Sequence, residues 1–384
     1  MMHEQQSLDR LTKLLALSIT ALVTLGLIMV LSSSYIFAKD TYGNSFYFFF
    51  KQIGYLSIAL IGAFVVSKTK HSFWLKYAPV FSMCIGFLIL LTYIPHFGSA
   101  AKGASRWLNL GFIRIQPGEF FKVACILSGI DLFENYQKYD RQKIIFRASV
   151  LIIPLLLLIK QPDFGTFIIC FLSLSLICYL SSFPRKWFYP ALLTGILAVI
   201  ILLFSQPYRV RRLMSYLDPW KNPQTTGFQI IQSYLAFANG SIVGTGLGNS
   251  NEKLFYLPEA HNDFIFSVVG EELGFLGVVS TVSLFAFFIV IGFKIGARAS
   301  TKLSYLTTVS IVSLVGMQAL LNMSVVLGII PTKGLNLPFI SSGGSSLLAN
   351  FWGLGILFSC IKYENKYSNE TFQNQNPSTY FLKS

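Results

Sequence analysis

The sequence predicts an all-α, polytopic integral membrane protein with ten transmembrane helices. Of its 384 residues, 53% are hydrophobic and only 12% are charged, whereas soluble globular domains carry about 25% charged residues. A membrane span needs about 20 predominantly apolar residues. Apolar runs of about this length lie at 14–37, 46–67, 73–94, 117–134, 146–160, 164–183, 187–205, 262–293, 303–328 and 344–362.

The distribution of basic residues predicts the orientation of these spans. Ten spans place both ends of the chain on one side of the membrane, and the short loops on that side, such as 138–147, are rich in lysine and arginine. Because such loops stay in the cytoplasm, both termini are predicted to be cytoplasmic. The longest extracytoplasmic loop is then 206–261, between the seventh and eighth spans. The expected parts are a cytoplasmic N-terminal tail at 1–13, a ten-helix membrane domain at 14–362 and a cytoplasmic C-terminal tail at 363–384.

The composition also argues against several classes of protein. The formal net charge is +14, but the basic residues are scattered in short loops, so the charge indicates membrane topology and not nucleic-acid binding. The first apolar run is too long for a signal peptide and lacks a small-residue cleavage site, so we expect it to remain as a span. The five cysteines lie within apolar runs without CxxC spacing, which argues against a disulfide framework.

The first candidate for a functional residue is Asp263, at the start of the eighth predicted span. An ionisable side chain in a span is costly and marks a functional site by default. On a continuous helix, several small residues would share the face of Asp263, and we expect this seam to pack against a neighbouring helix. The residues of the seam are Ser267, Gly270, Gly274 and Gly277.

Other ionisable residues in or beside the spans have structural explanations that compete with function. Glu119 and Lys122 are three residues apart on one helix face, and we expect a structural ion pair. Asp163 precedes a span, where it is either a helix N-cap or a ligand-binding residue. Glu271 is interpreted as a cavity residue and Glu272 as a pairing or interface residue, and a plain interhelical hydrogen bond is the alternative for each.

Positive charge in the predicted outer loops runs against the topology bias and suggests an anionic ligand on that side. Lipid headgroups or scattered carboxylates are the alternative explanation. The outer-loop cations are Lys102, Arg106, Arg114, Lys160, Arg209, Arg211, Arg212, Lys221, Lys253 and Lys333.

Polar residues just before the eighth and tenth predicted spans complete the candidate site. His261 and Glu259 lie beside Asp263, but the three do not have the spacing of a usual metal-ligand set. The Gly/Ser-rich segment before the last span either lines a cavity or forms a simple re-entrant loop. Its candidate ligands are Ser345 and Ser346.

Five sequence blocks, taken in order, resemble the SEDS family (shape, elongation, division and sporulation). They are GASRW with QPGE, QPDFGT, DPW with GFQ, PEAHNDFIFSVVGEELG and TKGLNLPFISSGGSS. The resemblance implies ten transmembrane helices and a peptidoglycan glycosyltransferase. Such an enzyme polymerises lipid II into β-1,4 glycan strands at the outer face of the cytoplasmic membrane, with inversion at the anomeric carbon and release of undecaprenyl pyrophosphate. The PEAH, VVGEELG and GLNLP sequences are more similar to the FtsW division branch than to the RodA elongation branch.

The resemblance also implies roles for particular residues. The essential acid of the family corresponds to Asp263, the lysine of its TKG block to Lys333 and the arginine of its RW block to Arg106. The Glu/Lys pair of the family's QPSE block corresponds to Glu119 and Lys122. The sequence departs from the family pattern at Gly118, Asn262 and Ser342, none of which removes an ionisable group, so the departures concern fine positioning.

The reaction suggests a mechanism for these residues. Pyrophosphate is a good leaving group, whereas the acceptor 4-hydroxyl needs a base, and we assign that role to Asp263. Cations stabilise the departing pyrophosphate, and a divalent cation, Mg²⁺ or Mn²⁺, could bind there through Asp263 or Glu259. No organic cofactor is expected. The residues assigned to substrate or pyrophosphate binding are Lys333, Arg106, Arg209, Arg211, Arg212, Lys102, His261, Glu259, Ser345 and Ser346.

Two other classes of protein would use a similar bundle. A lipid II flippase or transporter would carry its functional charge near the bilayer midplane, and a non-catalytic scaffold for a cell-wall synthase would tolerate substitution of Asp263. Within the family, a RodA-like role in elongation is the alternative. The resemblance implies a class B penicillin-binding protein and other divisome membrane proteins as partners, with lipid II as substrate. The expected location is the cytoplasmic membrane of a bacterium, at the division septum.

Overall fold

Long helices account for most of the structure, a computed structural model that describes residues 2–95, 97–101, 104–109, 111, 114–225, 227–250, 260–331 and 334–375. The first eight helices are α1 (Met2–Tyr42), α2 (Tyr47–Lys68), α3 (His71–Lys76), α4 (Ala78–Leu91), α5 (Pro117–Asn135), α6 (Arg141–Lys160), α7 (Phe164–Leu180) and α8 (Arg185–Phe204). The others are α9 (Pro207–Leu217), α10 (Phe228–Gly240), α11 (Ile265–Gly296), α12 (Lys302–Val326) and α13 (Gly344–Gln375). Short 3₁₀ turns lie at Tyr136–Lys138 and Pro219–Lys221.

Among the described residues, seven helices are long and apolar enough to cross a membrane: α1, α2, α6, α8, α11, α12 and α13. Helices α4 and α7 are apolar but shorter. Helix α5 carries Glu119, Lys122, Asp131 and Glu134, and these ionisable side chains make it less apolar. Each of the ten predicted runs overlaps a helix, with α3 and α4 sharing one run. The prediction of a multi-pass helical membrane protein is therefore confirmed, while ten crossings stay a prediction.

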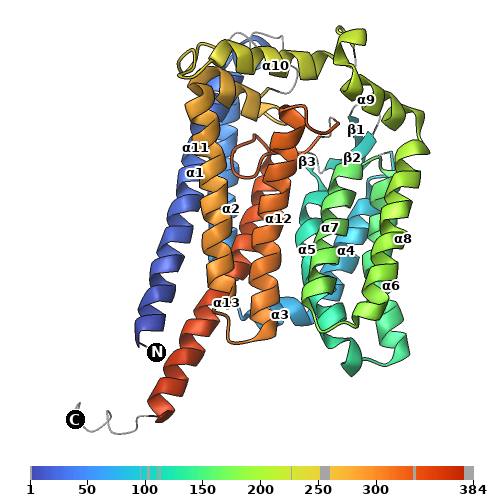
Figure 1. The fold of residues 1–384 in the computed structure, drawn as a ribbon, viewed down its shortest axis with the longest axis vertical. Helices are drawn as coiled ribbons and strands as arrows, with labels where there is room; N and C mark the ends of the chain where they lie inside the picture. Colours follow the sequence, from blue (N-terminus) through green and yellow to red (C-terminus); the bar gives the residue numbers. More distant parts are fainter. Residues whose placement is uncertain are drawn as a thin grey trace.

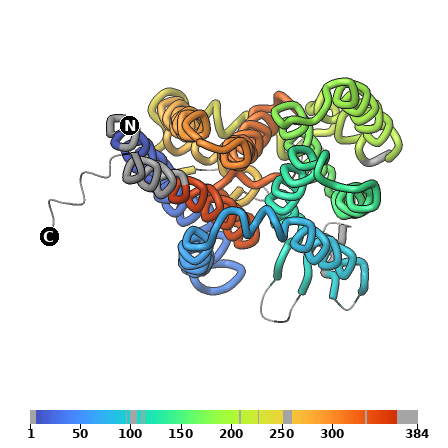
Figure 2. The backbone as a smooth tube through the Cα atoms, turned by 90° about the horizontal axis from the view of Figure 1, so that it is seen from below, coloured from blue at the N-terminus to red at the C-terminus, as the bar shows by residue number. Residues whose placement is uncertain are grey.

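The helices divide into two groups that meet at α5, α12 and α13. One hydrophobic cluster joins α1, α2, α11, α12 and α13, and a second joins α4, α5, α6 and α7. Helix α5 contributes side chains to both clusters, and it contacts α7, α12 and α13. The start of α1 and the end of α13 lie at the same end of the bundle, and α9, α10 and the strands lie at the opposite end (Figures 1 and 2).

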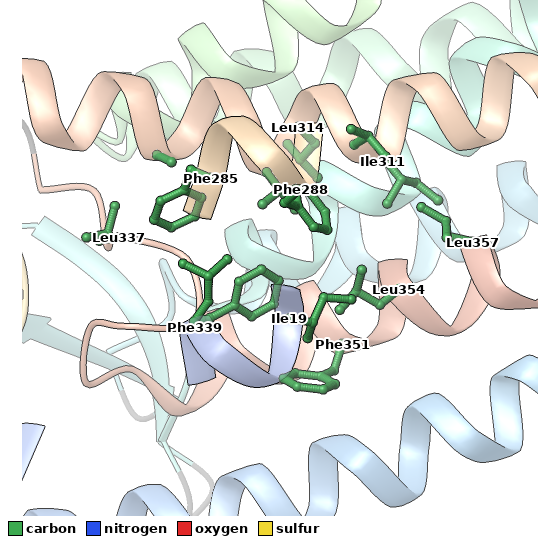
Figure 3. Packing of buried hydrophobic residues seen from close by; sticks show 14 of the residues in the cluster. Ile19, Phe285, Phe288, Ile311, Leu314, Leu337, Phe339, Phe351, Leu354 and Leu357 are labelled. Atoms are coloured by element: carbon green, nitrogen blue, oxygen red, sulfur yellow. The ribbon is translucent and has the colours of Figure 1, made fainter. Parts of the chain in front are cut away.

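The loop between α12 and α13 enters the bundle. Phe339 lies between the rings of Phe288 and Phe351, with ring centroids 6.3 and 5.8 Å away (Figure 3). Its carbonyl oxygen lies against Gly26 of α1, where an added Cβ would be only 2.3 Å away. The loop is thus irregular backbone buried within protein, the setting in which a membrane bundle tolerates it.

The prediction of an all-α chain misses a small antiparallel sheet in the loop between α4 and α5. Its strands are β1 (Gly98–Ala101), β2 (Ala104–Asn109) and β3 (Arg114–Ile115), in the order β1-β2-β3. Trp107 pairs with Ser99, and Leu108 pairs with Ile115. These ladders satisfy backbone groups of a loop that packs on α4 and α5, which such groups require when water is excluded. The sheet fixes the position of Arg106 on β2.

The continuous helix expected over 262–293 is also wrong. Helix α11 begins at Ile265 and is broken at Gly274, whose φ of 67° and ψ of −165° are non-helical. The segment 241–246, which follows α10, pairs with the break. The N–H groups of Thr245 and Gly246 donate to the carbonyls of Glu271 and Glu272 at 2.9 and 3.1 Å, and those of Phe275 and Leu276 donate to Ser241 and Ile242 at 2.9 and 3.2 Å.

The small-residue seam of α11 contacts this same part of the chain. A Cβ added to Gly270 would meet the Phe237 ring at 2.3 Å, and one added to Gly274 would meet the Gly244 nitrogen at 2.3 Å. The expectation that the seam packs against a neighbouring helix is confirmed at Gly270, which faces α10, whereas Gly274 faces the non-helical segment 241–246. At Gly277 an added Cβ would meet Leu273 of the same helix.

We predict that Gly274→Ala destabilises the protein. The backbone conformation of Gly274 is one that only glycine adopts readily, and forcing it on alanine costs about 1–3 kcal/mol before any steric clash is counted. The apparent unfolding temperature of the purified protein in detergent should fall. Gly62→Ala is the matched control, because Gly62 lies inside α2 with open space around its Cα. Equal unfolding temperatures for the two variants would contradict the prediction.

Candidate functional site

The turn 260–264, which precedes α11, is held in place through its backbone carbonyls. The Ser341 hydroxyl donates to the Asn262 carbonyl at 2.7 Å. The backbone N–H of Ser342 donates to the His261 carbonyl at 2.9 Å. The side chain of Asn322 on α12 donates to the Asp263 carbonyl at 2.8 Å. Three consecutive carbonyls are thus bonded to α12 and to the loop between α12 and α13.

The carboxylate of Asp263 and the guanidinium of Arg106 meet at Gly334. A Cβ added to Gly334 would lie 3.1 Å from Asp263 Oδ2 and 4.0 Å from Arg106 Nη1. Asp263 is half-buried. Glycine at this position therefore leaves an acid and a cation, 157 positions apart in the sequence, against the same residue.

A cavity of about 100 Å³ adjoins this point and is lined by three arginines, Arg106, Arg209 and Arg212. The rest of its wall comes from residues 162–165 at the start of α7, from the end of α8, from α9 and from the loop after α12. Gly334 belongs to that wall and Asp263 does not, so the Asp263 carboxylate lies against a residue of the cavity wall. The other lining residues are Pro162, Asp163, Phe164, Gly165, Leu203, Leu213 and Pro331.

The cationic residues differ in how they are held. Arg106 Nη2 donates to the Pro162 carbonyl, and its Nε atom is buried with no hydrogen-bond partner among the described residues. Arg209 is buried, donates to the Leu202 carbonyl at 2.5 Å, and lies 4.9 Å from the centre of the Phe164 ring. Its guanidinium therefore also stabilises the end of α8.

Two of the predicted arginines on α9 point to different surroundings. Both Arg211 and Arg212 are exposed, but only Arg212 lines the cavity. Lys333, Lys102 and Glu259 lie outside the described residues. His261 lies against the rings of Phe37 and Phe48, at centroid distances of 5.5 and 4.6 Å.

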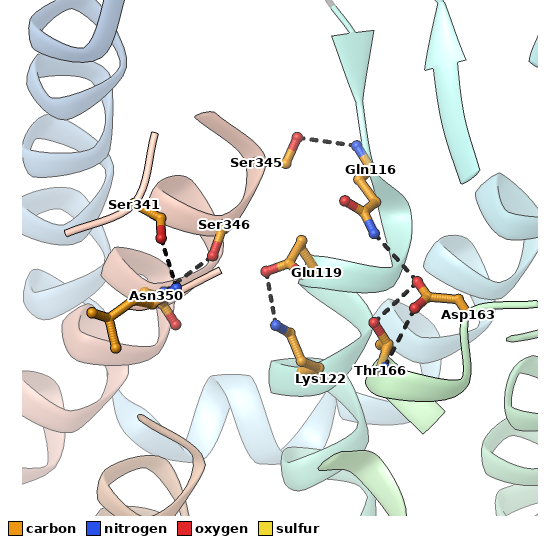
Figure 4. A network of polar contacts seen from close by, with 10 residues as sticks. Gln116, Glu119, Lys122, Asp163, Thr166, Ser341, Ser345, Ser346 and Asn350 are labelled. Carbon is orange, nitrogen blue, oxygen red and sulfur yellow. Dashed lines mark hydrogen bonds and ion pairs between the residues drawn. The ribbon is translucent and has the colours of Figure 1, made fainter. Parts of the chain in front are cut away.

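A polar network lies beneath the sheet at the start of α5 (Figure 4). Lys122 and Glu119 form a buried ion pair at 2.8 Å. Asp163 accepts bonds from the Thr166 backbone N–H at 3.4 Å and its hydroxyl at 3.0 Å, so it caps α7. It also accepts from the Gln116 side chain at 3.2 Å. The network thus joins α5 to α7.

The two predicted serine ligands are buried at the start of α13. The Ser345 hydroxyl accepts a hydrogen bond from the Gln116 backbone N–H at 3.0 Å. Ser346 accepts from the Asn350 side chain at 3.5 Å. Neither serine lines the described cavity. Their bonds hold α13 against α5 and stabilise α13 itself.

The two acids that precede the break at Gly274, Glu271 and Glu272, are fully buried. The Ser32 hydroxyl of α1 lies 2.6 Å from both carboxylate oxygens of Glu272, which gives the interhelical contact expected of this residue. The Ser250 hydroxyl donates to Glu271. Glu271 is absent from the cavity wall and instead holds the chain that follows α10.

Sequence reasoning missed Asn322, which contacts the backbone of both Asp263 and Leu335. An amide side chain within an apolar span was the available signal. Sequence reasoning also missed the Pro162 carbonyl as the partner of Arg106, because a backbone oxygen has no signature in the sequence.

The fold and the site define a helical membrane protein with a carboxylate beside a cation-lined cavity at one end of the bundle. The chain belongs to the FtsW/RodA/SpoVE family, whose model is described as a cell cycle protein and matches residues 12–366.

Three proteins, each named as a probable peptidoglycan glycosyltransferase FtsW, are similar over nearly their whole length. The one from Geobacter metallireducens is 37% identical, over 92% of this chain and 95% of the relative. The one from Geobacter sulfurreducens strain PCA is 38% identical, over 92% and 96%. The one from Saccharophagus degradans is 35% identical, over 95% and 96%.

Two solved structures share the fold. A chain from a study titled "Structural coordination of polymerization and crosslinking by a peptidoglycan synthase complex" is 27% identical, with a TM-score of 0.71 over 91% of this chain and 97% of that one. The rod shape determining protein RodA of Thermus thermophilus is 21% identical, with a TM-score of 0.67 over 91% and 96%. The second likeness concerns the fold alone.

We predict that Arg209→Gln lowers the unfolding temperature, because a buried guanidinium that donates to a helix-end carbonyl contributes about 1.5–3 kcal/mol. Arg211→Gln on the same helix is the control, since exposed substitutions change stability by about 0.5 kcal/mol or less. Thermal unfolding in detergent measures both. If Arg209→Gln and Arg211→Gln unfold at the same temperature as the parent, the stabilising contacts assigned to Arg209 are wrong.

Proposed function

We propose that this chain is a peptidoglycan glycosyltransferase that polymerises lipid II into β-1,4 glycan strands and releases undecaprenyl pyrophosphate. The observation that carries the proposal is the meeting of the Asp263 carboxylate and the Arg106 guanidinium at Gly334, on the wall of a cavity lined by three arginines. The FtsW-named relatives, 35–38% identical over nearly the whole chain, support the same activity.

Asp263 acts as the general base in this proposal. The acceptor 4-hydroxyl is poorly acidic, and a carboxylate within hydrogen-bonding reach removes its proton as the new glycosidic bond forms. The bond between the donor anomeric carbon and the pyrophosphate oxygen breaks in the same displacement. A single displacement inverts the anomeric carbon and requires a base without a covalent enzyme intermediate.

The arginines of the cavity stabilise the negative charge that develops on the pyrophosphate. Arg106, Arg209 and Arg212 share one cavity wall, and cations held in place before the reaction lower the barrier electrostatically. We assign the same role to Lys333, which precedes Gly334 in the sequence. Arg211, exposed on the other side of α9, is the weakest of the candidates.

A divalent cation is compatible with part of this site. Mg²⁺ is commonly held by one or two carboxylates together with substrate phosphates, and Asp263 supplies one carboxylate beside the cavity. Among the described residues, no group of three His, Cys, Asp or Glu side chains forms a metal cluster. We therefore propose that Asp263 would hold such an ion only together with the pyrophosphate, where the ion would neutralise charge on the leaving group.

We further propose how the chain is oriented in the membrane and where it acts. The chain crosses the membrane ten times with both termini in the cytoplasm, and α9, α10 and the sheet face the outside. Their position at the end of the bundle opposite the start of α1 supports this orientation (Figure 1). The FtsW-named relatives support a role in septal wall synthesis during division.

We also propose a class B penicillin-binding protein as partner, because polymerised strands must be cross-linked. One similar solved chain comes from a peptidoglycan synthase complex that coordinates polymerisation and crosslinking. This similarity supports the pairing. Other divisome membrane proteins are further proposed partners.

Asp263→Asn should lower the rate of glycan synthesis from purified lipid II by about 10²–10⁴-fold, the usual contribution of a general base. The measurement is the length and amount of glycan product resolved by electrophoresis. Asp140→Asn is the control, since Asp140 is an exposed acid at the start of α6. Polymerisation by Asp263→Asn at the parental rate would show that another group is the base. Movement of labelled lipid II across vesicles without polymerisation would favour a transporter instead.

A further inference from the structure

Asn322 joins two segments of the site through one side-chain nitrogen. It lies near the end of α12 and is buried, with 1% of its surface exposed. Its Nδ2 atom donates to the Asp263 carbonyl at 2.8 Å and to the Leu335 carbonyl at 2.5 Å. Both hydrogens of the amide nitrogen are therefore used, one on each segment.

These two segments carry the groups that meet at the cavity. Asp263 ends the turn before α11, and Leu335 directly follows Gly334, against which the Asp263 carboxylate and the Arg106 guanidinium lie. A donor shared by the two carbonyls fixes the distance between the segments. A hydroxyl group in this place would offer only one hydrogen, and an ionised carboxylate would offer none.

The amide of Asn322 lies in surroundings that leave one of its polar atoms unpaired. Asn322 Oδ1 is buried without a hydrogen-bond partner among the described residues, and the same holds for both amide atoms of Gln318, one turn earlier on α12. A buried polar group without a partner destabilises a folded protein. An aliphatic residue at position 322 would avoid the cost at Oδ1 but would leave the Asp263 and Leu335 carbonyls without their donor, so the bonds to these two segments account for asparagine there.

We infer that Asn322 is a positioning residue for Asp263. It holds the backbone of the proposed base at a fixed distance from the loop that bears Gly334, so that the carboxylate stays beside the cationic cavity. The inference rests on the proposed function. A displacement of about 1 Å in a reacting group can lower the rate about 10²-fold, which makes a backbone bond of this kind matter for the reaction.

The test compares two amide-to-leucine variants of the full chain on one helix. Asn322→Leu leaves two carbonyls without a donor and should lower the unfolding temperature. Assayed at a temperature where it stays folded, it should lower kcat for glycan synthesis about 10–100-fold, with KM for lipid II close to the parental value, because the lipid-binding groups remain. Gln318→Leu should keep the parental kcat, since its amide atoms have no hydrogen-bond partner among the described residues of the site. Asn322→Asp preserves the shape of the side chain, removes the NH₂ group and should also lower kcat.

The outcomes separate this inference from the proposed function. A parental kcat in Asn322→Leu, or an equal loss in Gln318→Leu, would overturn the positioning role. So would a loss of kcat that disappears when both Asn322 variants are assayed well below their unfolding temperatures, because that pattern indicates a purely structural bond. The parent and Asp263→Asn are measured in the same assay. If the parent makes no glycan, or if Asp263→Asn makes it at the parental rate, the proposed function or its base has failed independently of Asn322.

Discussion

Buried backbone that is not helical must find hydrogen-bond partners, and this requirement shapes the site. In the bundle no water is available to replace a missing bond, so each unpaired carbonyl or N–H group is costly. Three irregular segments meet around α11: the segment 241–246, the turn 260–264 and the loop between α12 and α13. The segment 241–246 is bonded to the backbone of α11 at its break. The turn and the loop are bonded to each other and to the side chain of Asn322 on α12. The position of Asp263 is a consequence of those bonds.

The charged residues are then arranged around this bonded frame. Arg106 comes from β2, Arg209 and Arg212 come from α9, and Asp263 comes from the turn before α11. These elements come from three separate parts of the sequence, and the fold brings them together. The pair of Glu119 and Lys122 has a different role, since the two side chains form a buried ion pair with each other. Because their charges neutralise each other, α5 can lie between the two helix groups.

The sequence predicts much of the fold, because apolar runs report spans directly. All ten predicted runs overlap helices, and Asp163 and Glu272 have contacts of the kinds expected from their positions. The break at Gly274 was not predictable from periodicity, because GEELGFLG reads equally well as a continuous helix. Its cause is the pairing of 241–246 with α11, a tertiary contact without a local signature. The sheet that carries Arg106 was missed because its strands are short and lack a clear alternation of apolar and polar residues.

The break in α11 also bears on how the protein is made. The segment that completes its backbone hydrogen bonds precedes α11 in the chain, and Thr245 and Glu271 are only 26 residues apart. The ribosome therefore synthesises the partner segment first, and the unpaired groups of α11 can be satisfied as soon as that helix emerges. Because the contact is local in sequence, it carries a small loop-closure cost. The broken helix α11 can therefore pair its backbone groups at the break before the last two helices of the bundle are synthesised.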